Sequence, residues 1–95
     1  MIDVKETIIK IVHKHVPDCR IFLFGSRARG THKEGADYDI ALDTGTKIPR
    51  ETMLKISGDI DESNIPVFVD VVDLNRISPT FFESIKEDLV LWTKS

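Results

Sequence analysis

Two groups of residues in the first half of the chain have side chains and spacing suited to binding phosphate and a metal ion. An apolar run ends at Phe24 and is followed at once by Gly25 and Ser26. A strand that stops at such a turn and leads into a helix offers backbone N–H groups and a hydroxyl to phosphate oxygens. Asp37 and Asp39 follow two residues apart, so on a strand both carboxylates would lie on one face.

The paired carboxylates indicate a magnesium site. Two ionised carboxylates side by side repel each other unless a cation lies between them. Magnesium prefers oxygen ligands and keeps part of its hydration, which suits a few carboxylates together with the phosphates of a substrate. Taken alone, the acids would also fit a polar strand end facing water, and a Gly-Ser turn occurs in many proteins. Together they are what a nucleoside triphosphate with magnesium requires, and they indicate nucleotidyl transfer.

A third acid, Asp70, stands inside the apolar run Val67–Val72. An ionised carboxylate at mid-strand among apolar residues is costly unless a partner or a metal compensates it. If this strand lies beside the one that carries the first two acids, three carboxylates converge on a site for two divalent ions. The alternative is a structural ion pair with a nearby basic side chain. The candidates for that pair are Arg20, Arg27 and Arg29.

The apolar periodicity predicts an alternation of helices and strands. We expect a helix from Val4 to Pro17, strands at Arg20–Phe24, around Asp37–Asp43 and at Val67–Val72, a short helix over Ser26–Gly30, helices starting at Pro49 and at Ser78-Pro79, and an edge strand within Leu89–Trp92. The expected core-facing residues of the last two helices are Met53, Leu54, Ile56, Ile60, Phe81, Phe82 and Ile85. The order α-β-α-β-α-β-α-β predicts an α/β domain.

Composition excludes several classes of protein. The chain has 95 residues, enough for one domain, and its 41% hydrophobic and 31% charged residues predict a folded, soluble protein. A net charge of −3 makes direct nucleic-acid binding unexpected. The single cysteine, Cys19, excludes an internal disulfide and a thiolate zinc cluster, and we expect it to be buried and inert. Because no long apolar run suggests a signal peptide or a membrane span, we expect a cytoplasmic protein with no membrane association.

Three motifs in order resemble a known family. Gly25-Ser26-Arg27-Ala28-Arg29-Gly30, then Asp37-Tyr38-Asp39, then Val69-Asp70-Val71 resemble the polymerase-β nucleotidyltransferase superfamily. The chain is most similar to the minimal nucleotidyltransferases (MNT), over essentially its whole length. The resemblance implies one small nucleotidyltransferase-fold domain over residues 1–95, with a mixed β-sheet flanked by helices.

The resemblance also implies a role for each motif. Asp37, Asp39 and Asp70 would be the catalytic and metal-binding residues, and Gly25, Ser26, Arg27 and Arg29 would bind the nucleotide. Two Mg²⁺ ions would act with ATP as the nucleotide substrate, and Asp70 would complete the ion that activates the attacking hydroxyl. Family members often carry serine just before the first aspartate, whereas Ala36 stands there in this chain, so one hydroxyl near the phosphates is missing.

Minimal family members commonly act with a separate helical HEPN-domain protein, as the antitoxin of a toxin–antitoxin pair. The resemblance therefore implies transfer of AMP to a hydroxyl, expected to be tyrosine, on a HEPN toxin. Two alternatives stay open: a non-catalytic subunit that binds nucleotide or a HEPN partner, and a structural subunit with vestigial motifs that binds no metal. An open sheet edge or the first helix could also join copies of the chain into a homo-oligomer.

Overall fold

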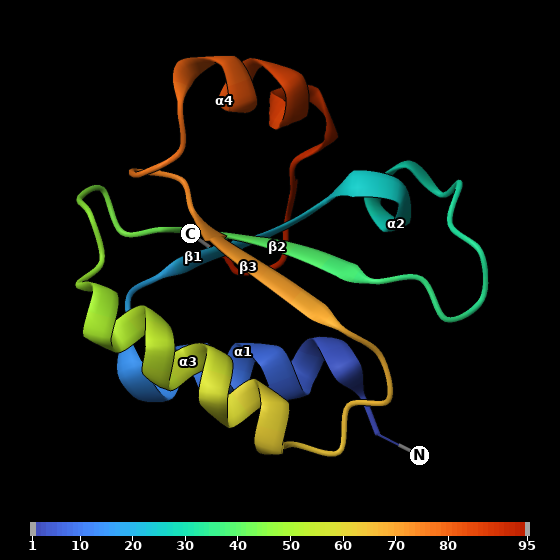
Figure 1. Cartoon of the computed structure of the whole chain (residues 1–95), viewed down its shortest axis with the longest axis horizontal. Coiled ribbons are helices and arrows are strands. Elements are labelled where there is room, and N and C mark those ends of the chain that lie inside the picture. The colour runs from blue at the N-terminus through green and yellow to red at the C-terminus, as the bar shows by residue number, and fades with distance from the viewer. Residues whose placement is uncertain (1, 95) are drawn as a thin grey trace.

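The sheet and helices of the computed structural model, which describes residues 2–94, alternate as the sequence predicts (Figure 1). The elements are α1 (Val4–His15), β1 (Arg20–Phe24), α2 (Gly25–Arg29), β2 (Tyr38–Asp43), α3 (Arg50–Glu62), β3 (Val69–Asp73), α4 (Pro79–Ile85), a 3₁₀ turn (Lys86–Asp88) and β4 (Val90–Leu91). The predicted start signals are confirmed at α4, where the Ser78 side chain accepts a hydrogen bond from the Phe81 N–H and Pro79 is in the first turn.

The strands form one mixed sheet in the order β3-β2-β1-β4. β1 pairs antiparallel with β2 and with β4, and β2 pairs parallel with β3. A parallel pair needs a long crossover, and α3 lies within that connection. The α/β class, the element order and the mixed sheet are therefore confirmed.

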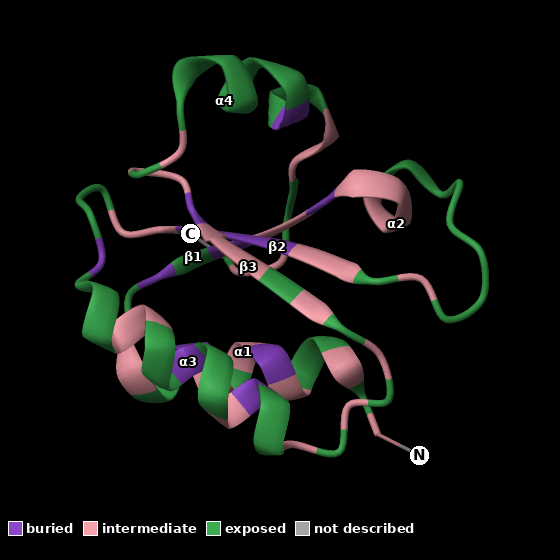
Figure 2. Cartoon of the chain, in the orientation of Figure 1, coloured by how far each residue is buried: buried purple, intermediate pink, exposed green. Residues whose placement is uncertain are grey.

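Helices cover the two faces of the sheet unequally. Figure 1 shows α1 and α3 together under one face and α4 over the other, while α2 continues from the end of β1. The larger core lies between the sheet and the α1–α3 layer, and it includes Ile8, Ile40 and Ile56, each fully buried (Figure 2). A smaller core joins Phe24 and Ala41 to α4. Alternation along β2 sends Ile40 to the first core and Ala41 to the second.

Three details of the predicted core and strands are wrong. Leu54 is 73% exposed, because it lies on the side of α3 next to the edge strand β3, where it lines a hollow with Val71. Phe81 and Phe82 are each 38% exposed, since the seven-residue α4 turns only part of its surface to the thin second core. The strand expected at Val67–Val72 begins at Val69 and runs to Asp73.

No helix in the described part of the chain has the length and apolar character needed to cross a membrane. Cys19 is buried as expected, and burial raises the pKa of its thiol to about 11. The thiolate, which is the reactive form of cysteine, is therefore disfavoured.

Candidate active site

Three carboxylates gather at one end of the parallel strand pair. The register of β2 and β3 sets Asp39 directly opposite Asp70, and Asp37 lies one residue before β2 begins. Ala41 and Val72 follow Asp39 and Asp70 by two residues, and both belong to the core on the α4 side of the sheet. Because side chains two apart on a strand share a face, Asp39 and Asp70 also point to that side. The structure thus sets two of the three predicted acids, Asp39 and Asp70, side by side on one face, and Asp37 is near enough for its charge to act on Asp39.

The pKa of the Asp39 carboxyl is affected by the neighbouring acids. Partial burial raises the pKa of the Asp39 carboxyl, and the negative charges of Asp70 and Asp37 raise it further. The positive charge of Arg29 opposes the shift. A cation held between these carboxylates would relieve the repulsion that the structure shows.

Asp70 itself is exposed, contrary to the burial that its apolar neighbours in the sequence suggest. β3 is an edge strand, and Figure 2 shows exposed and half-buried segments along it and no long buried run. The alternative of a structural ion pair also fails within residues 2–94. Arg20 pairs with Asp43, Arg29 pairs with Asp88, and Arg27 donates to the Ala36 carbonyl; none of the three forms an ion pair with Asp70.

Gly25 brings the start of α2 against the acids. Its predecessor Phe24 lies opposite Asp39 in the β1–β2 register. Gly25 has a φ of +76°, and a Cβ added there would lie 3.1 Å from Cγ of Asp39 and closer still to its Oδ2. Only glycine permits both this backbone conformation and this approach. The Gly25-Ser26 turn is therefore placed beside the carboxylates, and no side chain of the N-cap residue Phe24 caps the helix.

Arg27 has a positioning role that the sequence reasoning missed. Its Nε donates a hydrogen bond of 2.9 Å to the carbonyl oxygen of Ala36, and its guanidinium lies 4.0 Å from the ring centroid of Tyr38. Arg27 thereby ties α2 to the loop that carries Asp37. The bond uses the backbone of Ala36, so the missing serine hydroxyl does not affect it. No local sequence pattern predicts a contact between residues nine apart, and this one forms only because the loop folds back onto α2.

Arg29 connects α2 to the 3₁₀ turn that follows α4. Its Nη1 donates to Oδ2 of Asp88 at 2.8 Å, and Asp88 is the last residue of that turn. The pair leaves the Arg29 charge near enough to lower the pKa of Asp39. Of the two predicted arginines, Arg29 is the one whose charge lowers the pKa of Asp39.

The donor set fits magnesium once phosphate oxygens are added. Among residues 2–94, no three His, Cys, Asp or Glu side chains are already arranged to hold a metal ion. Magnesium is usually bound by one or two carboxylates with substrate phosphates and water, not by a complete protein cage. The neighbouring Asp39 and Asp70 supply oxygens of that kind, and the Gly25-Ser26 turn offers a place for the phosphates beside them.

Known proteins resemble this chain over most of its length. Residues 6–95 match the profile of the family described as "Polymerase beta, Nucleotidyltransferase". The "Probable protein adenylyltransferase MntA" of Haemophilus influenzae is 30% identical over 81 residues, which cover 85% of this chain and 71% of that protein.

Two solved structures share the fold. One is a toxin–antitoxin crystallised with AMP-PNP, with a TM-score of 0.79 and 23% identity over 96% of this chain and 73% of that one. The other is a mutant of the toxin–antitoxin MntA-HpeT, with a TM-score of 0.78 and 21% identity over the same shares of the two chains, 96% and 73%.

Proposed function

The chain belongs to the polymerase beta nucleotidyltransferase family and is a nucleotidyltransferase, and from that premise we propose that it transfers AMP from ATP to a hydroxyl group of a partner protein. The observation that carries the proposal is the β2–β3 register, which sets Asp39 beside Asp70 next to the Gly25 turn. Similarity to a probable protein adenylyltransferase supports AMP as the transferred group and protein as the acceptor.

We propose further that the partner is a HEPN-domain toxin, that the acceptor is a tyrosine, and that the chain acts as the antitoxin. Similarity to toxin–antitoxin structures supports the pairing, and the AMP-PNP of one of them is an ATP analogue.

In the reaction, the acceptor oxygen bonds to the α-phosphorus of ATP, and the bond from that phosphorus to pyrophosphate breaks. The hydroxyl proton passes to the carboxylate of Asp70, which is exposed, and from there to solvent. Bound Mg²⁺ would neutralise triphosphate charge and lower the pKa of the attacking hydroxyl. Asp37, Asp39 and Asp70 would hold the ions, while the Gly25-Ser26 turn and the Arg29 charge orient and attract the triphosphate.

The test uses the purified protein with a co-purified HEPN-domain protein, magnesium and ATP labelled either at the α- or at the γ-phosphate. We expect label from the α-phosphate alone on the partner. Asp39→Asn should lower the transfer rate by roughly 10²-fold or more, because it removes a negative ligand at the reacting phosphates. Asp61→Asn makes the same charge change on the exposed surface of α3 and should leave the rate unchanged.

Retention of full transfer by Asp39→Asn would contradict the assigned site. Absence of α-phosphate label on the partner with the unaltered protein, under conditions where it binds ATP, would contradict protein adenylylation and favour a non-catalytic subunit.

A further inference from the structure

The open edge of β3 has the features of a docking site for an extended polypeptide. β3 is the outermost strand of the sheet, and within residues 2–94 it pairs only with β2. The Tyr38 N–H bonds to the Phe68 carbonyl, and the Leu74 N–H bonds to the Leu42 carbonyl. In a parallel ladder these bonds turn the backbone groups of Phe68, Asp70 and Val72 toward β2. The N–H and C=O groups of Val69 and Val71 therefore point outward, away from the sheet.

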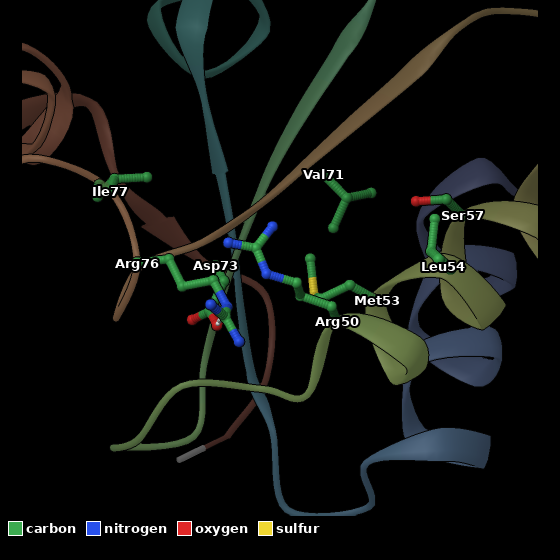
Figure 3. A pocket seen from close by; sticks show the side chains of 8 residues that line it. All are labelled: Arg50, Met53, Leu54, Ser57, Val71, Asp73, Arg76 and Ile77. Carbon is green, nitrogen blue, oxygen red and sulfur yellow. Dashed lines mark ion pairs between the residues drawn. The ribbon is translucent and has the colours of Figure 1, made fainter.

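A hollow lies beside this edge on the face opposite Asp70. It has a volume of about 390 Å³ and is lined on the strand side by Val71 and on the α3 side by Met53, Leu54 and Ser57 (Figure 3). Leu54 is 73% exposed, so a large apolar side chain remains uncovered at the border of the hollow. Exposed backbone groups together with a pocket for alternate side chains are the two requirements of β-strand addition.

We propose that an extended segment of the acceptor protein adds to β3 as a further strand and thereby presents its hydroxyl residue to Asp70. The inference rests on the proposed function, since it names how the protein substrate binds that site. The residue opposite Asp70 faces the carboxylates, and the residue opposite Val71 faces the hollow. Because successive residues of a strand point to opposite faces, the acceptor residue is adjacent in sequence to an apolar residue.

Charge adds a second element of recognition. Arg50 and Arg76 both line the hollow beside Asp73, two residues beyond Val71 along β3. The buried Asp73 carboxylate lies 3.5 Å from Nε of Arg76, so this end of the hollow has two guanidinium groups and one carboxylate. An acidic residue two positions beyond the apolar one would complement the Arg50 guanidinium. The segment thus reads hydroxyl–apolar–any–acidic along β3, or the reverse order if it runs antiparallel.

The experiment uses two synthetic peptides with Lys-Gly flanks, one containing Tyr-Leu-Ser-Glu and the other Glu-Ser-Leu-Tyr. We expect saturable binding of at least one of them, with amide hydrogen exchange slowed at Val69 and Val71. Peptides N-methylated at alternate residues test the backbone pairing. One peptide carries N-methyl groups on the first, third and later odd-numbered amides, and the other carries them on the even-numbered amides. One of these two methylation phases should weaken binding about tenfold or more and the other should not, because only every second amide of an added strand points to the edge.

Side-chain recognition is tested by Leu54→Ser, which should weaken peptide binding, against Lys55→Ser on the neighbouring exposed position, which should not. Equal effects of both methylation phases, or no slowing of exchange at Val69 and Val71, would overturn the proposal. Slowing that increases with protein concentration and needs no peptide would overturn it in favour of edge pairing between two copies. If a peptide binds β3 and neither it nor the partner protein gains AMP from magnesium and ATP, the docking edge stands and the proposed activity fails. If the partner protein gains AMP and the bound peptide does not, presentation of the hydroxyl to Asp70 is overturned.

Discussion

Replacing Gly25 with alanine should impair both the stability of the fold and the chemistry of the site, and a matched variant at Gly30 separates the two effects. Gly25 has a φ of +76°, and an added Cβ would lie 3.1 Å from Cγ of Asp39. The substitution therefore imposes backbone strain and also forces the Asp39 carboxylate out of its position beside Asp70. We expect loss of AMP transfer together with a measurable loss of stability.

The loss of stability has two contributions, backbone strain and overpacking. A left-handed backbone costs an alanine about 1–2 kcal/mol. The added contact with Asp39 is a case of overpacking, which costs about 1–3 kcal/mol more. For a domain of this size each kcal/mol lowers Tm by about 4–8 °C. Gly25→Ala should therefore lower Tm by about 8 °C or more.

Gly30→Ala is the matched control. Gly30 has the same φ of +76°, but no atom lies within 4 Å of its added Cβ. It should show only the backbone strain, about 1–2 kcal/mol by urea unfolding, and it should retain AMP transfer at a temperature where both variants are folded. If Gly25→Ala transferred AMP as fast as Gly30→Ala under those conditions, the close approach of α2 to Asp39 would have no part in the reaction.

Three further predictions concern groups away from the site. Asp73 is buried and accepts hydrogen bonds from the N–H groups of Ile48 and Asn75, so Asp73→Ala should cost about 1–3 kcal/mol for each donor it leaves unpaired, measured by urea unfolding. Burial raises the pKa of Cys19 from its usual 9.0 to about 11, so the unfolded chain loses that proton first; stability should fall as pH rises from 9 to 11, and Cys19→Ala should reduce the fall. The hydrogen bond from Asn75 is the largest cause of the lowered pKa of Asp43. The ionised Asp43 carboxylate therefore stabilises the fold above its usual pKa, and this stabilisation is lost as pH decreases through the lowered pKa of the folded state. Asn75→Ala should reduce this loss of stability in acid, measured by unfolding curves.

The elements predicted best are those whose signals are local. The bounds of β1 match the apolar run from Arg20 to the glycine that follows Phe24, and Ser78-Pro79 begins α4 through capping and a preset φ. Asp73 lies on the face opposite Asp70, as strand alternation requires. The exposure of Phe81 and Leu54 was not predicted. It depends on how far each helix extends over the sheet, and the residues within one helix carry no information about that tertiary arrangement.

Asp70 lies beside Asp39 as predicted, although the burial from which that prediction was argued is wrong. Apolar residues on both sides of it in sequence suggest a strand buried on both faces, and burial makes a charge require a metal. The structure exposes Asp70, and the order of strands sets β3 at the edge of the sheet. The charge therefore needs no compensation in the free protein, and the reason for a metal lies instead in the register that sets Asp70 beside Asp39. An exposed carboxylate at an open edge is also the arrangement that lets a large acceptor reach it, which a buried one would prevent.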